Sequence, residues 1–238
     1  MVKLAVSGAL GKMGTRIITL AKLDPSLKVV CKLEFSAHPD IGKKFDGVEL
    51  SSDMNAIANS DCLIEFTSPS ATIEHLEACV KFKRPIIIGT TGIVDAELVK
   101  INEAANKIPI VYSPNMSVGV NVLFNLLENA SRKLKNGYSV KIVEAHHIHK
   151  KDAPSGTAKK LKEIIEKESL VVKDIESIRE GEIVGDHRII FEGPYDTIEL
   201  FHSAKTRDIF AEGALRASKW IIGKKPALYS MFNVLEDK

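Results

Sequence analysis

The glycines that follow the first apolar segment constrain the fold of this chain most. Leu4–Ser7 reads as a short strand, and the segment GALGKMG at 8–14 leads from it directly into a helical stretch. GxxGxxG is a variant of the dinucleotide fingerprint, in which the glycines allow a tight turn, a close approach of backbone amides to a pyrophosphate, and close helix–strand packing. A helix N-terminus also attracts phosphate groups. We therefore predict cofactor contacts from Gly8, Ala9, Leu10, Gly11, Lys12 and Met13.

The second apolar strand ends in an acidic residue, Glu34, which lies 20 positions after Gly14. A carboxylate at that place holds the ribose hydroxyls of a dinucleotide. The next residue is Phe35, whereas a 2′-phosphate generally requires Arg or Lys beside the acid. The nearest basic neighbour is Lys32, on the strand itself. The pattern favours NADH over NADPH and leaves dual use open.

Residues 2–112 alternate short apolar runs with helical stretches at 12–22, 70–82 and 95–107. Apolar strands separated by helices predict a parallel sheet covered on both faces, in a Rossmann-like doubly wound α/β domain. Two further loops follow strands at the carboxyl edge, where such sheets bind ligands. They add these predicted cofactor contacts: Gly89, Thr90, Thr91, Ser113, Pro114, Asn115 and Met116.

The pattern changes after residue 116. An amphipathic helix is expected over 118–134, with Val122, Leu123, Leu126, Leu127 and Ala130 on one side. Strand-like segments at 138–145, 189–191 and 197–202, interrupted by a helix near 157–167, suit an α+β domain with an open mixed sheet. We therefore predict a dinucleotide-binding domain at 1–116 and a second domain at 117–212.

Composition excludes several classes of protein. Among 238 residues, no apolar run approaches the length of a membrane span, and the N-terminus does not read as a signal peptide. A net charge of +2 gives no case for nucleic acid. Cys31, Cys62 and Cys79 lack metal-ligand spacing and suit buried thiols in a reducing compartment. The sequence predicts a cytoplasmic protein with no membrane or nucleic-acid partner.

The most unusual segment is EAHHIHKKDAPSGTA at 144–158. Its histidines change charge near neutral pH and its lysines stay positive, so the loop would attract an anionic substrate and deliver a proton to it. Strand alternation separates His147 from His146, so not all three histidines can face one ligand. Ser155 then reads as the N-cap of a helix whose first amides form a carboxylate site. The segment indicates a substrate with one or more carboxylates.

Three other interpretations of this loop are less favourable: a metal site, a nucleophilic serine and a solvated basic loop. Histidines beside two lysines make a poor cation site, and no second ligand cluster is present, so we predict no metal. A nucleophilic Ser155 is disfavoured because the GxSxG elbow is absent. A solvated basic loop explains the lysines but not three clustered histidines beside an anion site.

The chain resembles one family over essentially its whole length, 4-hydroxy-tetrahydrodipicolinate reductase (dihydrodipicolinate reductase) of bacterial lysine and diaminopimelate synthesis. The residues that carry the resemblance are GALGKMG, LE at 33–34, EFTSP at 65–69, GTTG, SPNMSVGVN at 113–121, the 144–158 segment and FAEGALRASKWIIGK near the end. The histidine-to-SGT segment is the most specific of them.

The resemblance implies reduction of a cyclic dicarboxylate by NADH or NADPH. His146 matches the family's proton donor and acceptor, and Lys150 its partner proton donor. His147, Gly156 and Thr157 match contacts to the substrate carboxylates, and Ser155 joins them here as the cap. Family members are typically homotetramers joined through the second domain's sheet. The last helix usually returns to the first domain, which places 213–238 with it.

Three positions depart from better-known members, because Ile148, Ser68 and Phe35 stand where Arg is frequent. The first two leave the implied chemistry intact, and the third puts 2′-phosphate recognition in doubt. Two other functions stay open at this point. One is a two-domain dehydrogenase of a small amino-dicarboxylate, which would show a catalytic Cys or a Lys–Asp pair. The other is a regulator that senses NAD without turning it over, for which the histidine loop has no use.

Overall fold

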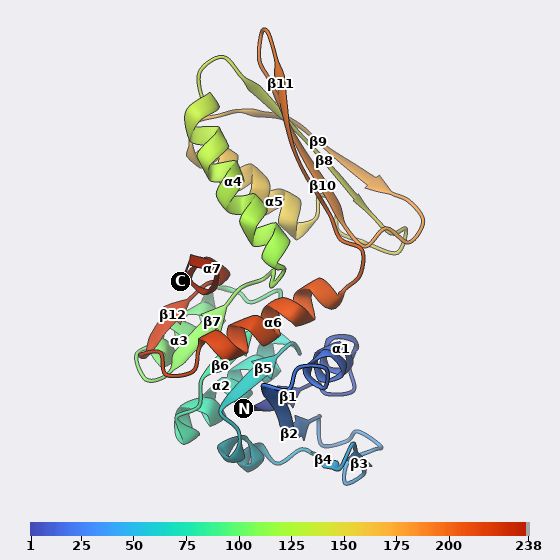
Figure 1. Ribbon diagram of the computed structural model, residues 1–238, viewed down its shortest axis with the longest axis vertical. Helices are drawn as coiled ribbons and strands as arrows, with labels where there is room; N and C mark the ends of the chain where they lie inside the picture. The colour runs from blue at the N-terminus through green and yellow to red at the C-terminus, as the bar shows by residue number, and fades with distance from the viewer. Residues whose placement is uncertain (237–238) are drawn as a thin grey trace. The chain divides into compact units, whose positions relative to one another are not determined.

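The computed structural model describes residues 1–236 and divides into two compact units (Figure 1). The first unit is formed by Met1–Ser117 together with the chain from Phe210 onward, and the second by Val118–Ile209. The chain therefore leaves the first unit one residue later than the predicted boundary and returns three residues earlier. Positions 237–238 of the predicted return segment lie outside the described residues.

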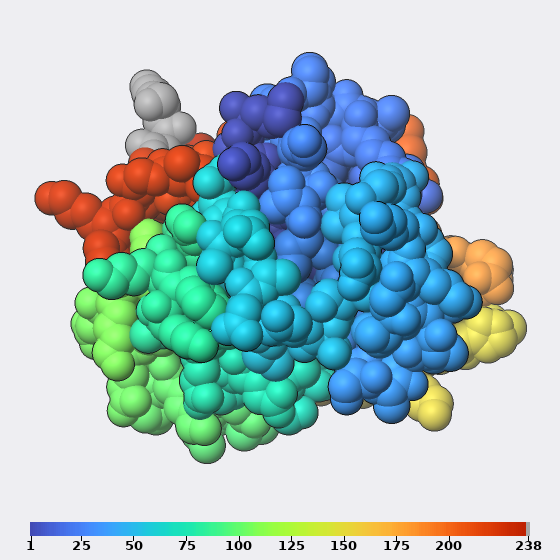
Figure 2. Space-filling model, turned by 90° about the horizontal axis from the view of Figure 1, so that it is seen from below, coloured from blue at the N-terminus to red at the C-terminus, as the bar shows by residue number. Residues whose placement is uncertain are grey.

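The first unit is built on an eight-stranded sheet in the order β12-β7-β6-β5-β1-β2-β4-β3. All neighbouring pairs are parallel except β3 and β4, which are antiparallel. The strands are β1 (Val2–Ser7), β2 (Leu27–Leu33), β3 (Lys44–Phe45), β4 (Val48–Ser51), β5 (Cys62–Glu65), β6 (Ile86–Ile88), β7 (Pro109–Tyr112) and β12 (Ala227–Tyr229). In Figure 2 the blue segments, which carry β1 to β4, lie beside the cyan and green segments that follow them, as this strand order requires.

Helices connect and cover these strands. They are α1 (Lys12–Ala21), the 3₁₀ helix η1 (Met54–Asn59), α2 (Pro69–Phe82), α3 (Asp95–Ala105), α6 (Asp208–Trp220) and α7 (Met231–Glu236). The central strands are buried on both faces, so Leu4, Leu63 and Ile86 are all 0% exposed. Each such side chain stabilises the fold by about 1.5–3 kcal/mol through its removal from water. The predicted doubly wound parallel sheet is confirmed.

The second unit is a four-stranded sheet in the order β11-β10-β8-β9, with two helices on one face (Figure 1). Its elements are α4 (Val118–Leu134), β8 (Ser139–His146), α5 (Gly156–Lys167), β9 (Val172–Arg179), β10 (Asp186–Glu192) and β11 (Thr197–Ser203). β8 pairs parallel with β9 and antiparallel with β10, so the predicted open mixed sheet is confirmed. Alternate residues of β8, namely Val140, Ile142, Glu144 and His146, are buried.

Two details of the predicted helices are wrong. α2 begins at Pro69, one residue before the predicted 70; its N-cap is Ser68, and Pro69 occupies the first turn, where its missing N–H costs nothing. The predicted apolar side of α4 is also misplaced, because Val122 and Leu126 are 45% and 52% exposed. The stripe that packs inward consists of Val120, Leu123, Phe124 and Leu127. Only the position of the sheet decides which of two overlapping apolar stripes is covered.

Four elements of the structure were not predicted from the sequence: β9, β3, β4 and η1. β9 is an edge strand with alternating charges (VKDIESIR), so it lacks the apolar run that marks a buried strand. Within residues 1–236, no helix is both long and apolar enough to cross a membrane.

Candidate active site

The glycine turn lies at the carboxyl end of β1 and has the geometry that its spacing predicts. Gly8 has a φ of +58°, which a side chain would disfavour. Ala9 N–H donates to Leu33 O at 3.1 Å, which ties the turn to the end of β2. α1 then begins with Gly11 as its N-cap, without a side-chain cap and without an acidic residue in its first turn. The helix therefore brings no anion of its own to its positive end, which suits a bound pyrophosphate.

The Glu34 carboxylate lies against the same turn. Its Oε1 accepts a hydrogen bond from Leu10 N–H at 2.9 Å. Lys32, the basic residue nearest in sequence, is only 2% exposed, and its Nζ donates to Phe45 O at 2.6 Å. Phe35, in contrast, is 64% exposed. The edge of the sheet near Glu34 thus presents an aromatic ring, and the ammonium of Lys32 is committed elsewhere.

The other predicted cofactor segments follow β6 and β7. The strands β2, β1, β5, β6 and β7 are successive neighbours and parallel, so the loops after them share one edge with the glycine turn. Within these loops the Thr90, Ser113 and Met116 side chains are buried, whereas Thr91 and Pro114 are exposed. The structure therefore brings all the predicted segments to one edge and leaves only some of their side chains accessible.

A buried polar cluster that the sequence did not predict lies beneath this edge. Glu65, at the end of β5, is fully buried and contacts His75 Nδ1 at 2.5 Å, and its oxygens also accept from Ser7 and Thr67. Burial acts to raise the pKa of Glu65, but His75, Ser7 and Thr67 outweigh it and hold the pKa below its usual value. The only signal in the sequence is one acid at the end of an otherwise apolar strand.

In the second unit, the end of β8 carries His146 beside a second buried carboxylate. Glu144 is 0% exposed and His146 is 8% exposed. Glu144 Oε2 accepts a short hydrogen bond from His146 Nδ1, and its Oε1 accepts from Arg179 Nη2 at 2.8 Å and from Ser155 N–H at 3.3 Å. Donors from three separate segments therefore converge on one carboxylate.

A second histidine completes this cluster. His187, on β10, packs edge-on against His146, with ring centroids 5.3 Å apart, and its Nε2 lies 3.3 Å from Ser155 Oγ. Burial first, and then the charge of His146, lower the pKa of His187 to about 3. The ring is therefore neutral, and its Nε2 can accept a hydrogen bond from the Ser155 hydroxyl.

Ser155 is the N-cap of α5, as predicted: its Oγ accepts from Ala158 N–H at 3.1 Å. A Cβ added at Gly156 would meet nothing within 4 Å, so the first turn of the helix is open on that side. An uncrowded helix start of this kind can accept a carboxylate.

The remaining residues of the basic loop differ in accessibility. Lys150 is partly buried and its Nζ contacts Asp152 Oδ1 at 2.8 Å. His149 is largely exposed, and its ring lies 6.2 Å from that of His147. Of the three histidines, only His146 lies on β8 and is buried; His147 is half-buried and His149 exposed, and both lie beyond the end of the strand.

Burial and charge set the protonation of the central pair. Burial raises the pKa of Glu144, but hydrogen bonds from Arg179, Ser177 and His146 outweigh it and hold the pKa low. Burial is also the main reason that the pKa of His146 is lowered, and Glu144 works against that effect. The arrangement is an ionised carboxylate that holds a neutral imidazole able to exchange a proton.

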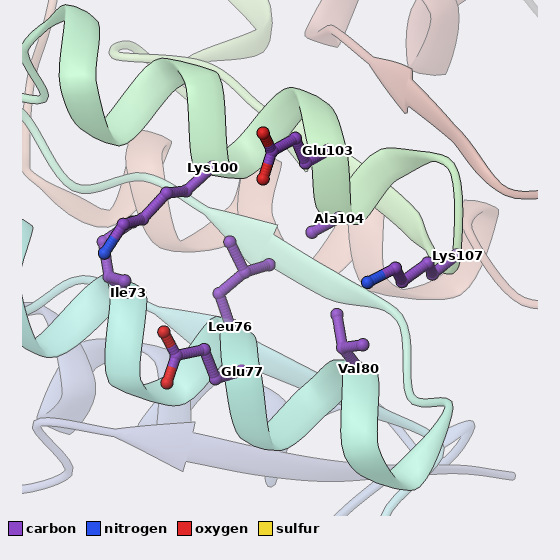
Figure 3. Close-up of a pocket in the computed structure, with 8 residues that line it drawn as sticks. All are labelled: Ile73, Leu76, Glu77, Val80, Lys100, Glu103, Ala104 and Lys107. Atoms are coloured by element: carbon purple, nitrogen blue, oxygen red, sulfur yellow. The ribbon is translucent and has the colours of Figure 1, made fainter.

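Two observations bear on other kinds of site. Among residues 1–236, no group of three or more His, Cys, Asp or Glu side chains is placed to hold a metal ion. A pocket of about 280 Å³ lies between α2 and α3, lined by the residues in Figure 3. None of the predicted site residues lines it, and in Figure 3 Leu76 points from α2 toward Ala104 of α3. We assign it no ligand.

A doubly wound sheet defines a dinucleotide-binding protein when a glycine turn leads into its first helix and the first turn of that helix has no acidic residue. The buried Glu144–His146 pair of the second unit, with the pKa values of both groups shifted and an open helix start beside it, suits a reaction rather than passive binding. Together the fold and these groups describe an NAD(P)H-dependent oxidoreductase.

Comparison with known proteins gives the family. The models for the N-terminus and the C-terminus of dihydrodipicolinate reductase match residues 2–116 and 119–235. Proteins called 4-hydroxy-tetrahydrodipicolinate reductase from Anaeromyxobacter dehalogenans and Geobacter metallireducens are each 40% identical, over 99% of this chain and 98% and 99% of their own lengths. The chain belongs to the dihydrodipicolinate reductase family.

A solved structure shows the same fold. The dipicolinate-bound dihydrodipicolinate reductase from Paenisporosarcina sp. TG-14 superimposes with a TM-score of 0.84 at 22% identity, over 98% of this chain and 99% of that one. The family models and the 40% identical relatives confirm the family resemblance drawn from the sequence.

Proposed function

We propose that this chain reduces 4-hydroxy-tetrahydrodipicolinate to tetrahydrodipicolinate with NADH or NADPH, a step of lysine and diaminopimelate synthesis. The observation that carries the proposal is the cluster at the end of β8, where His146, Lys150 and the start of α5 all come from one short segment. Within 15 residues this segment provides groups that can donate a proton and a helix start that can bind a substrate carboxylate, as a dicarboxylate reductase needs.

The first unit would hold the cofactor, and its residues fit one. A Cβ at Gly14 would lie 2.0 Å from Gly8 O, so only glycine allows α1 to start this close to the turn. The amides of the turn and of the first turn of α1 would hold the pyrophosphate, Glu34 the ribose hydroxyls, and the loops at 89–91 and 113–116 the nicotinamide half. When bound, the cofactor supplies the hydride, which would add to C4 of the substrate ring after the 4-hydroxyl has left as water.

We propose a preference for NADH. Lys32 is buried and donates to Phe45 O, so it does not offer its charge to a 2′-phosphate. Phe35 presents an apolar ring where Arg would bind that phosphate. A Phe35→Arg variant should improve kcat/KM for NADPH about tenfold through one charge-assisted contact. An unchanged ratio of NADPH to NADH use would refute this assignment.

In the second unit, His146 and Lys150 would deliver the proton as the reduced ring collapses to product. His147 and the amides of Gly156 and Thr157 would hold the substrate carboxylates. Ser155 would act through its cap of α5, because its hydroxyl oxygen already accepts from Ala158 N–H. The proton-donating form of His146 carries hydrogen on both ring nitrogens, and its lowered pKa means that this form gives up its proton readily and returns to the neutral ring.

The test follows the loss of NADH or NADPH absorbance with freshly made 4-hydroxy-tetrahydrodipicolinate. His146→Gln and Lys150→Ala should each lower kcat about 100-fold, in the range of general acid–base catalysis, with little change in cofactor affinity. His149→Gln and Lys151→Ala are matched controls from the same loop, because both side chains are exposed. Normal turnover by both site variants would refute the assignment, and no absorbance loss with either cofactor would refute the function.

The alternative dehydrogenase with a catalytic cysteine gains no support. All three cysteines are buried, and burial raises the pKa of Cys31 to about 12 and the pKa values of Cys62 and Cys79 well above the ordinary value. None offers the accessible thiolate that a nucleophile needs. A non-catalytic NAD sensor would bind cofactor without turnover in the same assay.

We also propose a cytoplasmic homotetramer joined through the open face of the second unit's sheet. α4 and α5 cover one face, and on the other Phe201 is 54% exposed, with Arg188 stacked over its ring. An exposed aromatic residue on an uncovered sheet is typical of an interface. Sedimentation should give four times the chain mass of 26.1 kDa, and Phe201→Glu should lower it.

A further inference from the structure

The carboxylate of Glu144 has no role in the function proposed above, yet it is the best-connected polar group of the second unit. It sits two residues before His146 on β8, so both side chains point to the same, helix-covered face of the sheet. It is fully buried. Burying a carboxylate costs free energy unless hydrogen-bond donors compensate it. The donors that contact Glu144 therefore indicate its role.

One oxygen of Glu144 fixes the proton on the imidazole. Oε2 lies within hydrogen-bond distance of His146 Nδ1. An ionised carboxylate only accepts hydrogen bonds, so Nδ1 must carry the hydrogen. The other ring nitrogen, Nε2, is then the atom that gains and loses the exchanged proton. A Cβ added at Gly185 would lie 3.1 Å from Nε2, so the absence of a side chain there keeps that nitrogen uncrowded.

The other oxygen of Glu144 holds the approach to α5. Oε1 accepts from Ser155 N–H at 3.3 Å and from Arg179 Nη2 at 2.8 Å. Arg179 Nη2 also donates to Asp152 O at 2.6 Å, so the same ion pair fixes the loop at both ends of 152–155. The carboxylate therefore links the start of the helix to the imidazole.

We propose that Glu144 is the positioning residue of this site, setting the tautomer of His146 and the placement of the α5 start together. The inference rests on the proposed function, in which His146 exchanges a proton and the helix start binds a carboxylate. It adds that these two parts are held in register by one side chain, and that Arg179 serves the site by holding Glu144.

A carboxylate, and not its amide, is required here because all of its partners donate. Gln has the same shape but only one accepting oxygen and an NH₂ group. If that NH₂ faced Arg179 and Ser155, donors would oppose donors. If it faced His146, the ring would have to accept at Nδ1 and carry its proton on Nε2. Either arrangement breaks one function of the carboxylate.

Charged and titratable groups face His146 from each surrounding segment: Glu144 on β8, Arg179 on β9, His187 on β10 and Lys150 in the loop. Of these, Glu144 is the one that favours the protonated ring. Removing its charge should therefore lower the pKa of His146 further and move the limb of the pH–rate profile that His146 controls toward acid.

The experiment compares Glu144→Gln with Glu144→Asp, which keeps the charge, and with Glu163→Gln, an exposed control on α5. For Glu144→Gln we expect kcat to fall about 30-fold, a smaller loss than the full acid–base contribution, and KM for the dicarboxylate to rise several-fold. KM for NADH should stay within about twofold, and the pH limb should shift by about one unit. Glu144→Asp should restore the limb toward its wild-type position.

Several outcomes overturn the inference. A folded Glu144→Gln enzyme with wild-type kcat and an unshifted limb would do so, as would equal defects in the Gln and Asp variants. His146→Gln is measured alongside: if it turns over normally, the proposed function has failed, whereas a defect confined to His146→Gln leaves the proposed function standing and refutes the role of Glu144. Should Glu144→Gln not fold, ¹⁵N spectra of the wild-type histidines report the tautomer directly, and a proton on Nε2 of neutral His146 refutes the proposal.

Discussion

Replacing Gly14 by alanine tests whether the glycine turn is held by close packing. Gly14 is buried in the first turn of α1, and an added Cβ would lie 2.0 Å from Gly8 O and 2.8 Å from Ala9 Cα. All of these atoms belong to backbone, so no side-chain rotation can relieve the contact. The turn must open by about 1 Å or more to restore ordinary separations.

Two effects of opposite sign decide the outcome. Alanine is favoured over glycine within a helix by about 1 kcal/mol. Overpacking against a rigid neighbour costs about 3 kcal/mol at the upper end of its usual range, and backbone contact places this site there. We therefore expect a net destabilisation of about 2 kcal/mol in urea unfolding, together with NADH binding weakened about tenfold or more as the amides of the turn leave their positions.

Thr15→Ala is the matched control, because Thr15 is the exposed neighbour on the same helix and should change stability little. Gly11→Ala gives an intermediate case, since its Cβ would lie 3.1 Å from the same Gly8 O. Measurement requires unfolding midpoints at fixed protein concentration and the quenching of NADH fluorescence. A Gly14→Ala protein that is as stable as wild type, or that binds NADH unchanged, would refute the packing argument.

Three further predictions concern buried groups. The pKa of Glu65 is held below its usual value of 4.5, so its contribution to stability is present above that pH and is lost as pH falls; His75→Gln should flatten the loss seen by urea unfolding at low pH. The pKa of His187 is about 3 in the folded protein against 6.5 in the unfolded chain, so the free energy of unfolding should fall as pH drops below 6.5. At 1.36 kcal/mol per pKa unit the loss reaches about 4–5 kcal/mol near pH 3. A His187→Gln protein whose stability falls with pH as steeply as that of wild type would contradict this. Gly213→Ala would set a Cβ 1.8 Å from Met116 O. We expect it to lower the free energy of unfolding by about 2 kcal/mol, to lower the thermal midpoint by several degrees, and to weaken NADH binding.

Much of the fold could be predicted because its signals are local. The 3.6-residue period of 118–134 gives α4 to the residue, and the apolar runs give the five central strands of the first sheet. β9 could not be found, since an edge strand with charges on both faces has no distinctive period. Local periodicity also failed to choose the buried stripe of α4, because that choice depends on where the sheet lies.

The candidate site divides in the same way. The residues of the glycine turn and of the loop around His146 stand close together in the sequence, with spacings that reflect one turn or one helix start. Glu144 is two residues from His146, and strand alternation alone would place the two side chains on one face. Arg179 and His187 carry no such signal, because they reach the site only through the pairing of β9 and β10 with β8.

The sequence by itself determined that this chain has a dinucleotide-type sheet, a glycine turn with Glu34 beside it, and a histidine-rich loop that leads into a helix start. These follow from residue types and spacings within single supersecondary units. Only the tertiary structure decided that Lys32 is turned into the protein, that Glu65 is held beneath the cofactor edge, and that Glu144 gathers donors from three segments. Such convergence depends on strand register across long stretches of chain, and the cost of burying a charge without partners then selects which groups must meet.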